Sequence, residues 1–129
     1  ADLVDRDLGL VNRARGSGLR RCFDDAIAAL AAERPASRGA LTDAIDGYEL
    51  TTTAHESPAR KVAAGDADAG LGLAATAASL DLGFVPLGTQ SVTVVAAPDR
   101  VDKPGVRDLA AALDDCGGLA APLEGIDPQ

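Results

Sequence analysis

Short strand-forming segments alternate with helical patterns along most of this chain, and that alternation restricts the folds open to it. Residues 8–12, Leu-Gly-Leu-Val-Asn, form an apolar segment that predicts a buried strand. After a turn rich in Gly and Arg, four apolar residues recur at helical spacing: Leu19, Phe23, Ile27 and Leu30. Further strands are expected over 48–53, 67–73, 84–87 and 91–97, and helices over 40–45, 57–64, 74–80 and 104–113. This order is typical of an α/β fold with a largely parallel sheet.

We therefore expect a three-layer mixed sheet of about five strands flanked by helices. Segment 91–97 is expected to run antiparallel to the others. Only three residues separate it from 84–87, whereas a parallel crossover needs about a dozen. Residues 1–115 are expected to form one compact unit with a C-terminal helix. Residues 116–129, rich in Gly and Pro, are expected to form a poorly packed tail.

The surface chemistry is acidic. The chain carries 20 acidic and 12 basic residues, for a net charge of -8, and only two of the bases are lysines. Such a composition is typical of proteins from concentrated salt, where screening reduces self-repulsion, although an acidic protein from a GC-rich genome would share it. A negative surface disfavours nucleic acid and anionic membranes as partners. The start does not resemble a signal peptide and no long apolar run occurs, so we expect a cytoplasmic, halophilic protein without a membrane span.

One segment reverses this charge. Residues 8–23 contain no acid but hold four arginines, Arg13, Arg15, Arg20 and Arg21. Ser17, between two glycines, is a natural N-cap for the following helix. Helix N-termini bind anions through unpaired N–H groups and the helix dipole, so an anion site is predicted here. The alternative is an ordinary capped helix with solvated arginines. Substituting Ser17 by Ala is expected to cost about 0.5–2 kcal/mol through the lost cap.

Other motifs are weaker. A P-loop needs a lysine after its second glycine, and neither Lys61 nor Lys103 has that setting. Segment 70–75 fits a variant dinucleotide fingerprint but lacks a good preceding strand. His55 is the sole histidine, so no closed zinc site is expected. Two roles stay open for His55: contact with a ligand, or capping at the start of a helix. No nucleophile and base are paired by a motif, so we expect neither an enzyme nor a cofactor. The chain has two cysteines, Cys22 and Cys116; a buried thiol is expected at Cys22, and a disulfide between the two stays open.

Several of these stretches occur together in a familiar order. They are Val11-Asn12-Arg13, Gly16-Ser17-Gly18-Leu19-Arg20, Gly47-Tyr48, Thr53-Ala54-His55, and segments 63–72 and 81–87. Over residues 2–113 the chain resembles the periplasmic-binding-protein-like domain of prokaryotic molybdenum proteins. In that family the domain is joined to a molybdopterin-biosynthesis module or to a winged-helix, molybdate-responsive regulator module.

The resemblance implies one lobe of a type 2 periplasmic-binding-protein-like fold, with its ligand in the cleft between two lobes. The chain looks like the second lobe with the return through the hinge. The first lobe and an upstream module of the same protein are therefore expected before Ala1. Segment 51–61 is shorter than usual for the family, with Glu56-Ser57-Pro58 among small residues.

The resemblance also implies three ligand-binding loops that converge on one point. The candidate residues are Arg13, Ser17, Gly18, Thr53, His55, Gly72 and Leu73. The expected function is non-catalytic binding of an oxyanion such as molybdate or tungstate, or of a molybdopterin species, within a molybdenum cofactor biosynthesis protein. The alternative is an interaction, assembly or effector-sensing domain of a molybdate-responsive regulator whose cleft is vestigial.

Overall fold

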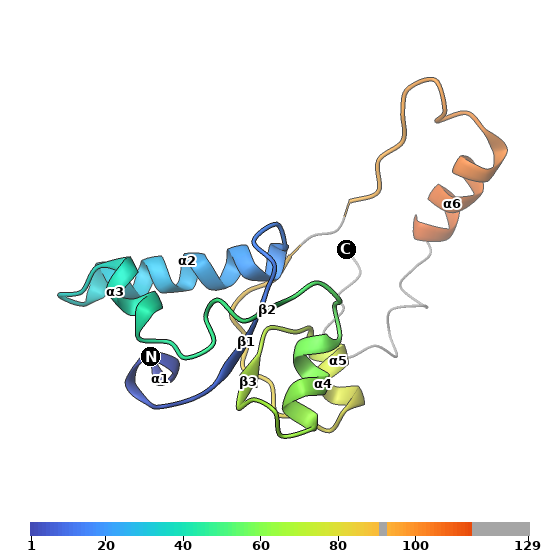
Figure 1. Cartoon of the computed structure of the whole chain (residues 1–129). Coiled ribbons are helices and arrows are strands. Elements are labelled where there is room, and N and C mark those ends of the chain that lie inside the picture. The colour runs from blue at the N-terminus through green and yellow to red at the C-terminus, as the bar shows by residue number, and fades with distance from the viewer. Residues whose placement is uncertain (91–92, 115–129) are drawn as a thin grey trace. The chain divides into compact units, whose positions relative to one another are not determined.

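A computed structural model describes residues 1–90 and 93–114 of the chain. The chain divides into two compact units, Ala1–Gly88 and Thr89–Gln129, which are coloured by residue number in Figure 1. The described part of the second unit contains one helix, α6 (Pro104–Asp114), which has no buried residue. Among the described residues, no helix is both long and apolar enough to cross a bilayer. The candidate residues all lie in the first unit.

A small parallel sheet forms the centre of the first unit. Strand β1 (Leu10–Arg13) lies between β2 (Thr51–Thr52) and β3 (Ala69–Gly70), in the order β2-β1-β3. Both neighbours run parallel to β1, and Arg13 is the register partner of Thr52. All four residues of β1 are buried, as expected for a central strand covered on both faces.

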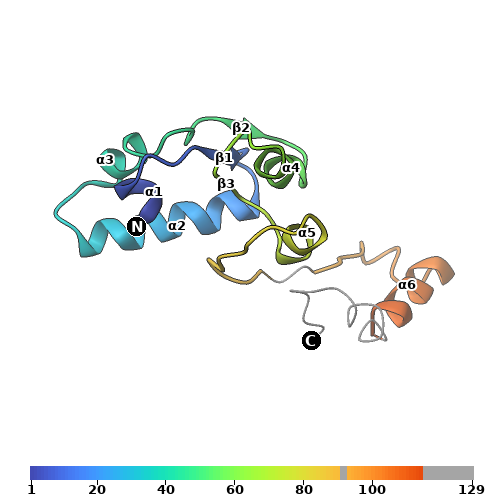
Figure 2. The same ribbon diagram turned by 90° about the horizontal axis from the view of Figure 1, so that it is seen from below.

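Five helices accompany the sheet in the described part of this unit. They are α1 (Asp2–Asp5), α2 (Gly18–Glu33), α3 (Arg38–Asp43), α4 (Ser57–Ala63) and α5 (Ala74–Ser79). Successive side chains of a strand point to opposite faces. Leu10 packs in one cluster with residues of α2, whereas Gly70, the register partner of Val11, lies against Pro58 of α4. Helices therefore cover both faces of the sheet, which gives three layers (Figure 2).

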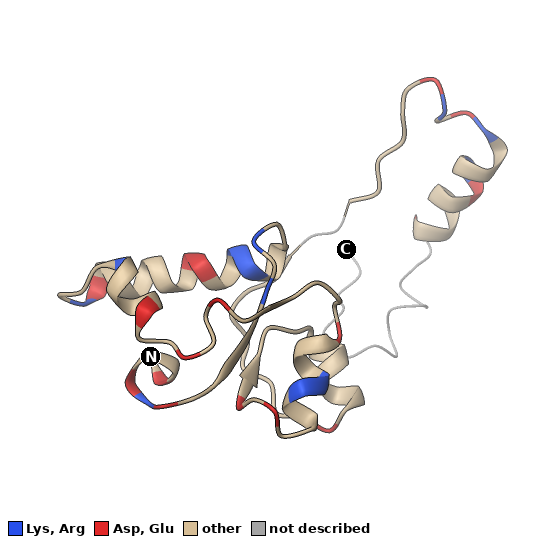
Figure 3. Cartoon of the chain, viewed as in Figure 1, with Lys and Arg blue, Asp and Glu red and all other residues tan. Residues whose placement is uncertain are grey.

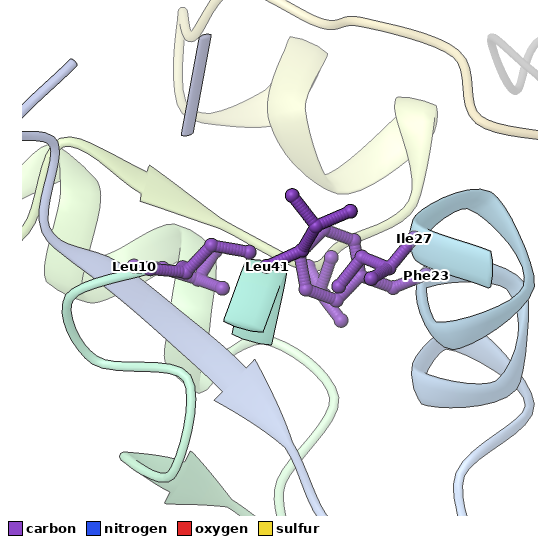
Figure 4. Packing of buried hydrophobic residues seen from close by; sticks show 6 residues of the cluster. Leu10, Phe23, Ile27 and Leu41 are labelled. Carbon is purple, nitrogen blue, oxygen red and sulfur yellow. The ribbon is translucent and has the colours of Figure 1, made fainter. Parts of the chain in front are cut away.

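The core lies between β1 and α2. Its buried apolar residues are Leu10, Phe23, Ile27, Leu41, Ile45 and Leu71. Figure 4 shows the side chain of Leu10 from β1 and those of Phe23 and Ile27 from α2 in this cluster. The helical spacing of Phe23 and Ile27 predicted this buried face, and the structure confirms the helix with its N-cap at Ser17.

The prediction of a five-stranded mixed sheet is not confirmed: the described residues form three strands, and all of them are parallel. Segment 84–87 is not a strand, and neither is 93–97, while residues 91–92 lie outside the described residues. Strand-forming residues are present in both segments, but Val85 is 82% exposed and Val95 is 85% exposed. An extended segment becomes a strand only when a neighbour satisfies its backbone groups, and β-propensity alone does not supply that neighbour. The predicted antiparallel pairing is thus absent from the described part of the chain, and the tail 116–129 lies outside it.

Gly47 lets the loop before β2 pass close to β1. Its φ angle is +78°, and a Cβ atom added there would lie 2.0 Å from the carbonyl oxygen of Leu10. The loop makes this approach because the N–H of Leu10 donates to the carbonyl of Asp46 over 3.0 Å. A side chain at residue 47 would therefore separate the loop from the strand.

Gly47→Ala should destabilise the first unit far more than Gly65→Ala. Gly65 has a φ of +79° but open space around it, so Gly65→Ala is expected to cost about 1–2 kcal/mol of left-handed strain alone. Gly47→Ala adds the steric overlap with Leu10, for a total of about 2–5 kcal/mol. Urea unfolding followed by circular dichroism measures both, and equal costs would contradict the close approach.

Candidate functional site

The parallel sheet brings the three predicted loops to one edge. β1 leads into α2, β2 leads into α4, and β3 leads into α5. Because the strands are parallel, their carboxyl ends lie at the same edge, where α/β sheets generally bind ligands. Segments 14–17, 53–56 and 71–73 therefore leave the sheet side by side. Two bonds connect the chain at the end of β1 to the chain at the end of β2: Ala14 N–H donates to the Thr52 carbonyl, and Arg13 Nη1 donates to the Ala54 carbonyl.

The N-terminus of α2 offers unpaired backbone donors at this edge. Ser17 has extended backbone angles, φ -77° and ψ 138°, and its side chain makes no capping bond. Within the described part of the chain, no backbone carbonyl accepts from the N–H of Gly18, Leu19 or Arg20. The first turn of a helix leaves such N–H groups without intrahelical partners. Since α2 is 16 residues long, its dipole adds positive potential at the same point.

The arginines predicted as one basic group have different surroundings (Figure 3). Arg15 is exposed and reaches Glu49 over 3.2 Å. Arg21 is exposed, whereas Arg20 is only 2% exposed and pairs with Asp24. The interpretation of these residues as solvated arginines is therefore wrong for Arg20, which is buried. The carboxylate of Asp24, one helical turn later, balances the buried charge.

Arg13 is a buried cation without a carboxylate partner among the described residues. It is 3% exposed, its Nη1 donates to the Ala54 carbonyl, and its Nε has no partner. The hydroxyl of Thr52, its register partner on β2, is also buried and without a partner. Buried charges are expensive unless they are paired, and buried polar groups are normally hydrogen-bonded. Two adjacent exceptions at the carboxyl edge therefore mark the strongest candidate for a ligand contact.

The other predicted residues lie at the same edge but are more open to solvent. Thr53 and His55 are exposed in the loop between β2 and α4. Gly72 is half-buried, and Leu73, at the N-cap of α5, is 49% exposed. The helices α4 and α5 that follow these loops have seven and six residues, so α2 supplies the main helix dipole. Sequence reasoning missed Thr52, whose importance depends on its register opposite Arg13.

A partly buried polar network joins the first two turns of α2 to Tyr48. Tyr48 donates its hydroxyl to Asp24 Oδ1 over 2.7 Å, and Arg20 Nε donates to the same oxygen over 2.9 Å. Arg20 also lies over the Tyr48 ring, 4.2 Å from its centroid. Burial alone would raise the pKa of Asp24, but the bonds from Tyr48 and Arg20 outweigh it, so this pKa is lowered from 3.8.

The described residues contain no group of three His, Cys, Asp or Glu side chains that could hold a metal ion. Cys22 is half-buried in α2, and Cys116 lies outside the described residues. What the edge presents is a set of hydrogen-bond donors.

A family model described as a PBP superfamily domain matches residues 1–114. The chain belongs to the PBP superfamily. This membership confirms the predicted periplasmic-binding-protein-like character over all of the described residues.

One curated relative shows how much of a longer protein the chain matches. The uncharacterized protein YvgK of Bacillus subtilis (strain 168) is 32% identical over 94 residues, which cover 73% of this chain and 28% of the relative. The stretch that this chain matches thus spans only about a quarter of the length of that relative. No solved structure matches the chain.

The two serine N-caps of this PBP superfamily domain should respond differently to mutation. Ser37 Oγ accepts from the Ala40 N–H over 3.1 Å, so Ser37→Ala should cost about 1 kcal/mol. Ser17 makes no such bond, so Ser17→Ala should cost less than the 0.5–2 kcal/mol expected of a working cap. Urea midpoints of the two variants provide the test, and a larger loss at Ser17 would show that its hydroxyl caps α2 in solution.

Acid should remove the contribution of Asp24 to stability. Because its pKa is lowered on folding, this contribution is complete above the unfolded-state pKa of about 3.9. It is lost as the pH falls through the lower folded value. Asp24→Asn should therefore lower the free energy of unfolding at pH 7 by about 1–3 kcal/mol, and this difference should shrink below about pH 4.

The matched control is Asp25→Asn, which changes the exposed neighbouring carboxylate on the same helix. Denaturant titrations from pH 7 to pH 3 should show little difference between this control and the unchanged chain. A constant difference for Asp24→Asn across that range would contradict the lowered pKa.

Proposed function

We propose that this domain binds a small oxyanion at the carboxyl edge of its sheet, as a ligand-binding module without catalysis of its own. The observation that carries the proposal is Arg13, a residue that is 3% exposed and has an unpaired Nε and no carboxylate partner among the described residues. A bound anion would supply the missing counter-charge. Membership of the PBP superfamily supports ligand binding in general.

The donor set favours a multiply charged anion with several oxygens. Arg13 Nε and the Thr52 hydroxyl lie on neighbouring strands, and the N–H groups of Gly18 and Leu19 lie at the start of α2. Strand alternation places Arg13 on the face of the sheet opposite the α2 core, so the donors approach the end of β1 from both faces. Molybdate and tungstate carry oxygens in all directions and suit such an arrangement, as does the phosphate of a molybdopterin species.

We place the domain in a protein of molybdenum cofactor biosynthesis. The basis is the set of motifs that include Arg13, Ser17, Gly18 and His55, taken together with a relative more than twice as long as the chain. In this setting the domain holds or senses the anion while other parts of the protein act on it. An assembly role in a molybdate-responsive regulator is the outcome to accept if the edge binds no anion.

Affinity for the chain alone should be low. Gly18, Thr53 and His55 are exposed to solvent, and water weakens every electrostatic contact at an open edge. We expect a dissociation constant in the millimolar range, about 4 kcal/mol of binding free energy.

Arg13→Met should remove binding without destabilising the fold. Methionine preserves much of the side-chain length, and replacing an uncompensated buried charge by an apolar group is generally neutral or stabilising. Calorimetric titration of molybdate, tungstate and sulfate at constant ionic strength measures the binding, and urea unfolding measures the stability. The control is Arg15→Met, which removes an exposed arginine paired with Glu49 and should alter binding little.

Gly18→Pro tests the backbone donors at α2. Proline is favoured at the first helical position, and the extended Ser17 backbone already suits a following proline. The variant should fold and bind more weakly because one N–H is gone. If the chain binds none of the three anions, or both variants bind as well as the unchanged chain, the oxyanion proposal is wrong.

A further inference from the structure

Tyr48 contacts both β1 and α2, and it does so through three different groups. Its hydroxyl donates to Asp24 Oδ1 over 2.7 Å, its ring lies under the Arg20 guanidinium at 4.2 Å, and its carbonyl accepts from Asn12 Nδ2 over 2.8 Å. The residue thus joins the end of β1 to the first turns of α2. The sequence motifs placed Gly47-Tyr48 in the chain but gave the tyrosine no role.

The network holds both residues that precede the loop to α2. Asn12 is fixed by the Tyr48 carbonyl, and its own Oδ1 accepts from the Arg13 N–H over 2.8 Å. The Arg13 carbonyl accepts from Arg20 Nη1 over 3.4 Å. Arg20 is in turn fixed by Asp24, whose second oxygen lies 3.4 Å from Arg38 Nη2. The backbone of Arg13 is therefore held at its N–H by the Asn12 side chain and at its carbonyl by the Arg20 side chain.

We propose that Tyr48, Asp24 and Arg20 are positioning residues of the oxyanion site. They fix the end of β1 against the first turn of α2, and so set the spacing between the Arg13 side chain and the backbone donors of Gly18 and Leu19. This inference rests on the proposed function, because positioning has meaning only if an anion binds there. Coupling between binding and a structural network is reciprocal, so a bound anion should in turn stabilise the network, and we expect this to change the surroundings of Tyr48.

The chain contains its own reporter for this coupling. Tyr48 is the single tyrosine, and the chain has no tryptophan. Tyrosine emission therefore comes from the residue at the centre of the network. Tungstate is a suitable probe because it is transparent where tyrosine is excited.

The experiment titrates sodium tungstate into the 129-residue chain at constant ionic strength and pH, read by calorimetry and by Tyr48 emission. We expect the emission to change saturably, with the same midpoint as the calorimetric isotherm. An isotherm without an emission change overturns the positioning role and leaves the oxyanion proposal standing. If no heat is measured, the oxyanion proposal fails and this inference fails with it.

Variants of Tyr48 test whether the network affects binding. Tyr48→Phe keeps the ring and removes the hydroxyl, and we expect it to weaken tungstate binding at least threefold. The matched control is Thr42→Val, which removes the hydroxyl that donates to the Gly39 carbonyl on α3 and should leave the midpoint unchanged. Equal binding by Tyr48→Phe and the unchanged chain overturns the role. Should Tyr48→Phe fail to fold, as judged by circular dichroism, the emission titration of the unchanged chain still decides the matter.

Discussion

The parallel pairing of β1 with both of its neighbours is the constraint on which the first unit depends. β1 is only four residues long, yet it is buried throughout, with β2 and β3 at its edges and α2 and α4 on opposite sides. Parallel pairing requires a long crossover between consecutive strands, and α2 with α3 fills the first of these. The same pairing brings the segments that follow β1, β2 and β3 to one edge. The position of the candidate site is thus a consequence of strand direction, and its donors come from the ends of β1 and β2 and from the first turn of α2.

The fold of the first unit also requires two segments of backbone to pass very close to their neighbours, and a glycine at each point makes this possible. Gly47 lies against the Leu10 carbonyl, and Gly70 lies against Pro58, where an added Cβ atom would be 2.9 Å from the proline side chain. The first contact brings the chain back to β1 before β2, and the second brings α4 onto β3. Both contacts depend on the absence of a side chain, so hydrophobic burial alone does not account for the packing of the two layers against the sheet.

Local patterns in the sequence predicted the elements well, and non-local features poorly. The spacing of Phe23 and Ile27 predicted the buried face of α2, and Ser57-Pro58 predicted the start of α4. Whether 84–87 or 93–97 becomes a strand depends on a neighbouring strand, which composition does not reveal. Thr52 became a candidate only through its register opposite Arg13. Asp24, four residues after Arg20, was the one local feature of the sequence that could have indicated the burial of Arg20. The importance of this ion pair depends on Tyr48, which is distant in sequence.

Because the buried guanidinium of Arg13 has no counter-charge among the described residues, the stability of the fold would depend on the concentration of an anion that binds it. A domain that contains such a charge is less stable empty than occupied, since an anion bound only to the folded state adds to the free energy of unfolding in proportion to the logarithm of its concentration. If the proposed oxyanion binds, its occupancy affects how often the chain opens, and hence its exposure to proteases that cut unfolded segments. When the ligand of Arg13 is scarce, the protein would then be degraded sooner. This response would need no conformational switch other than the folding equilibrium itself.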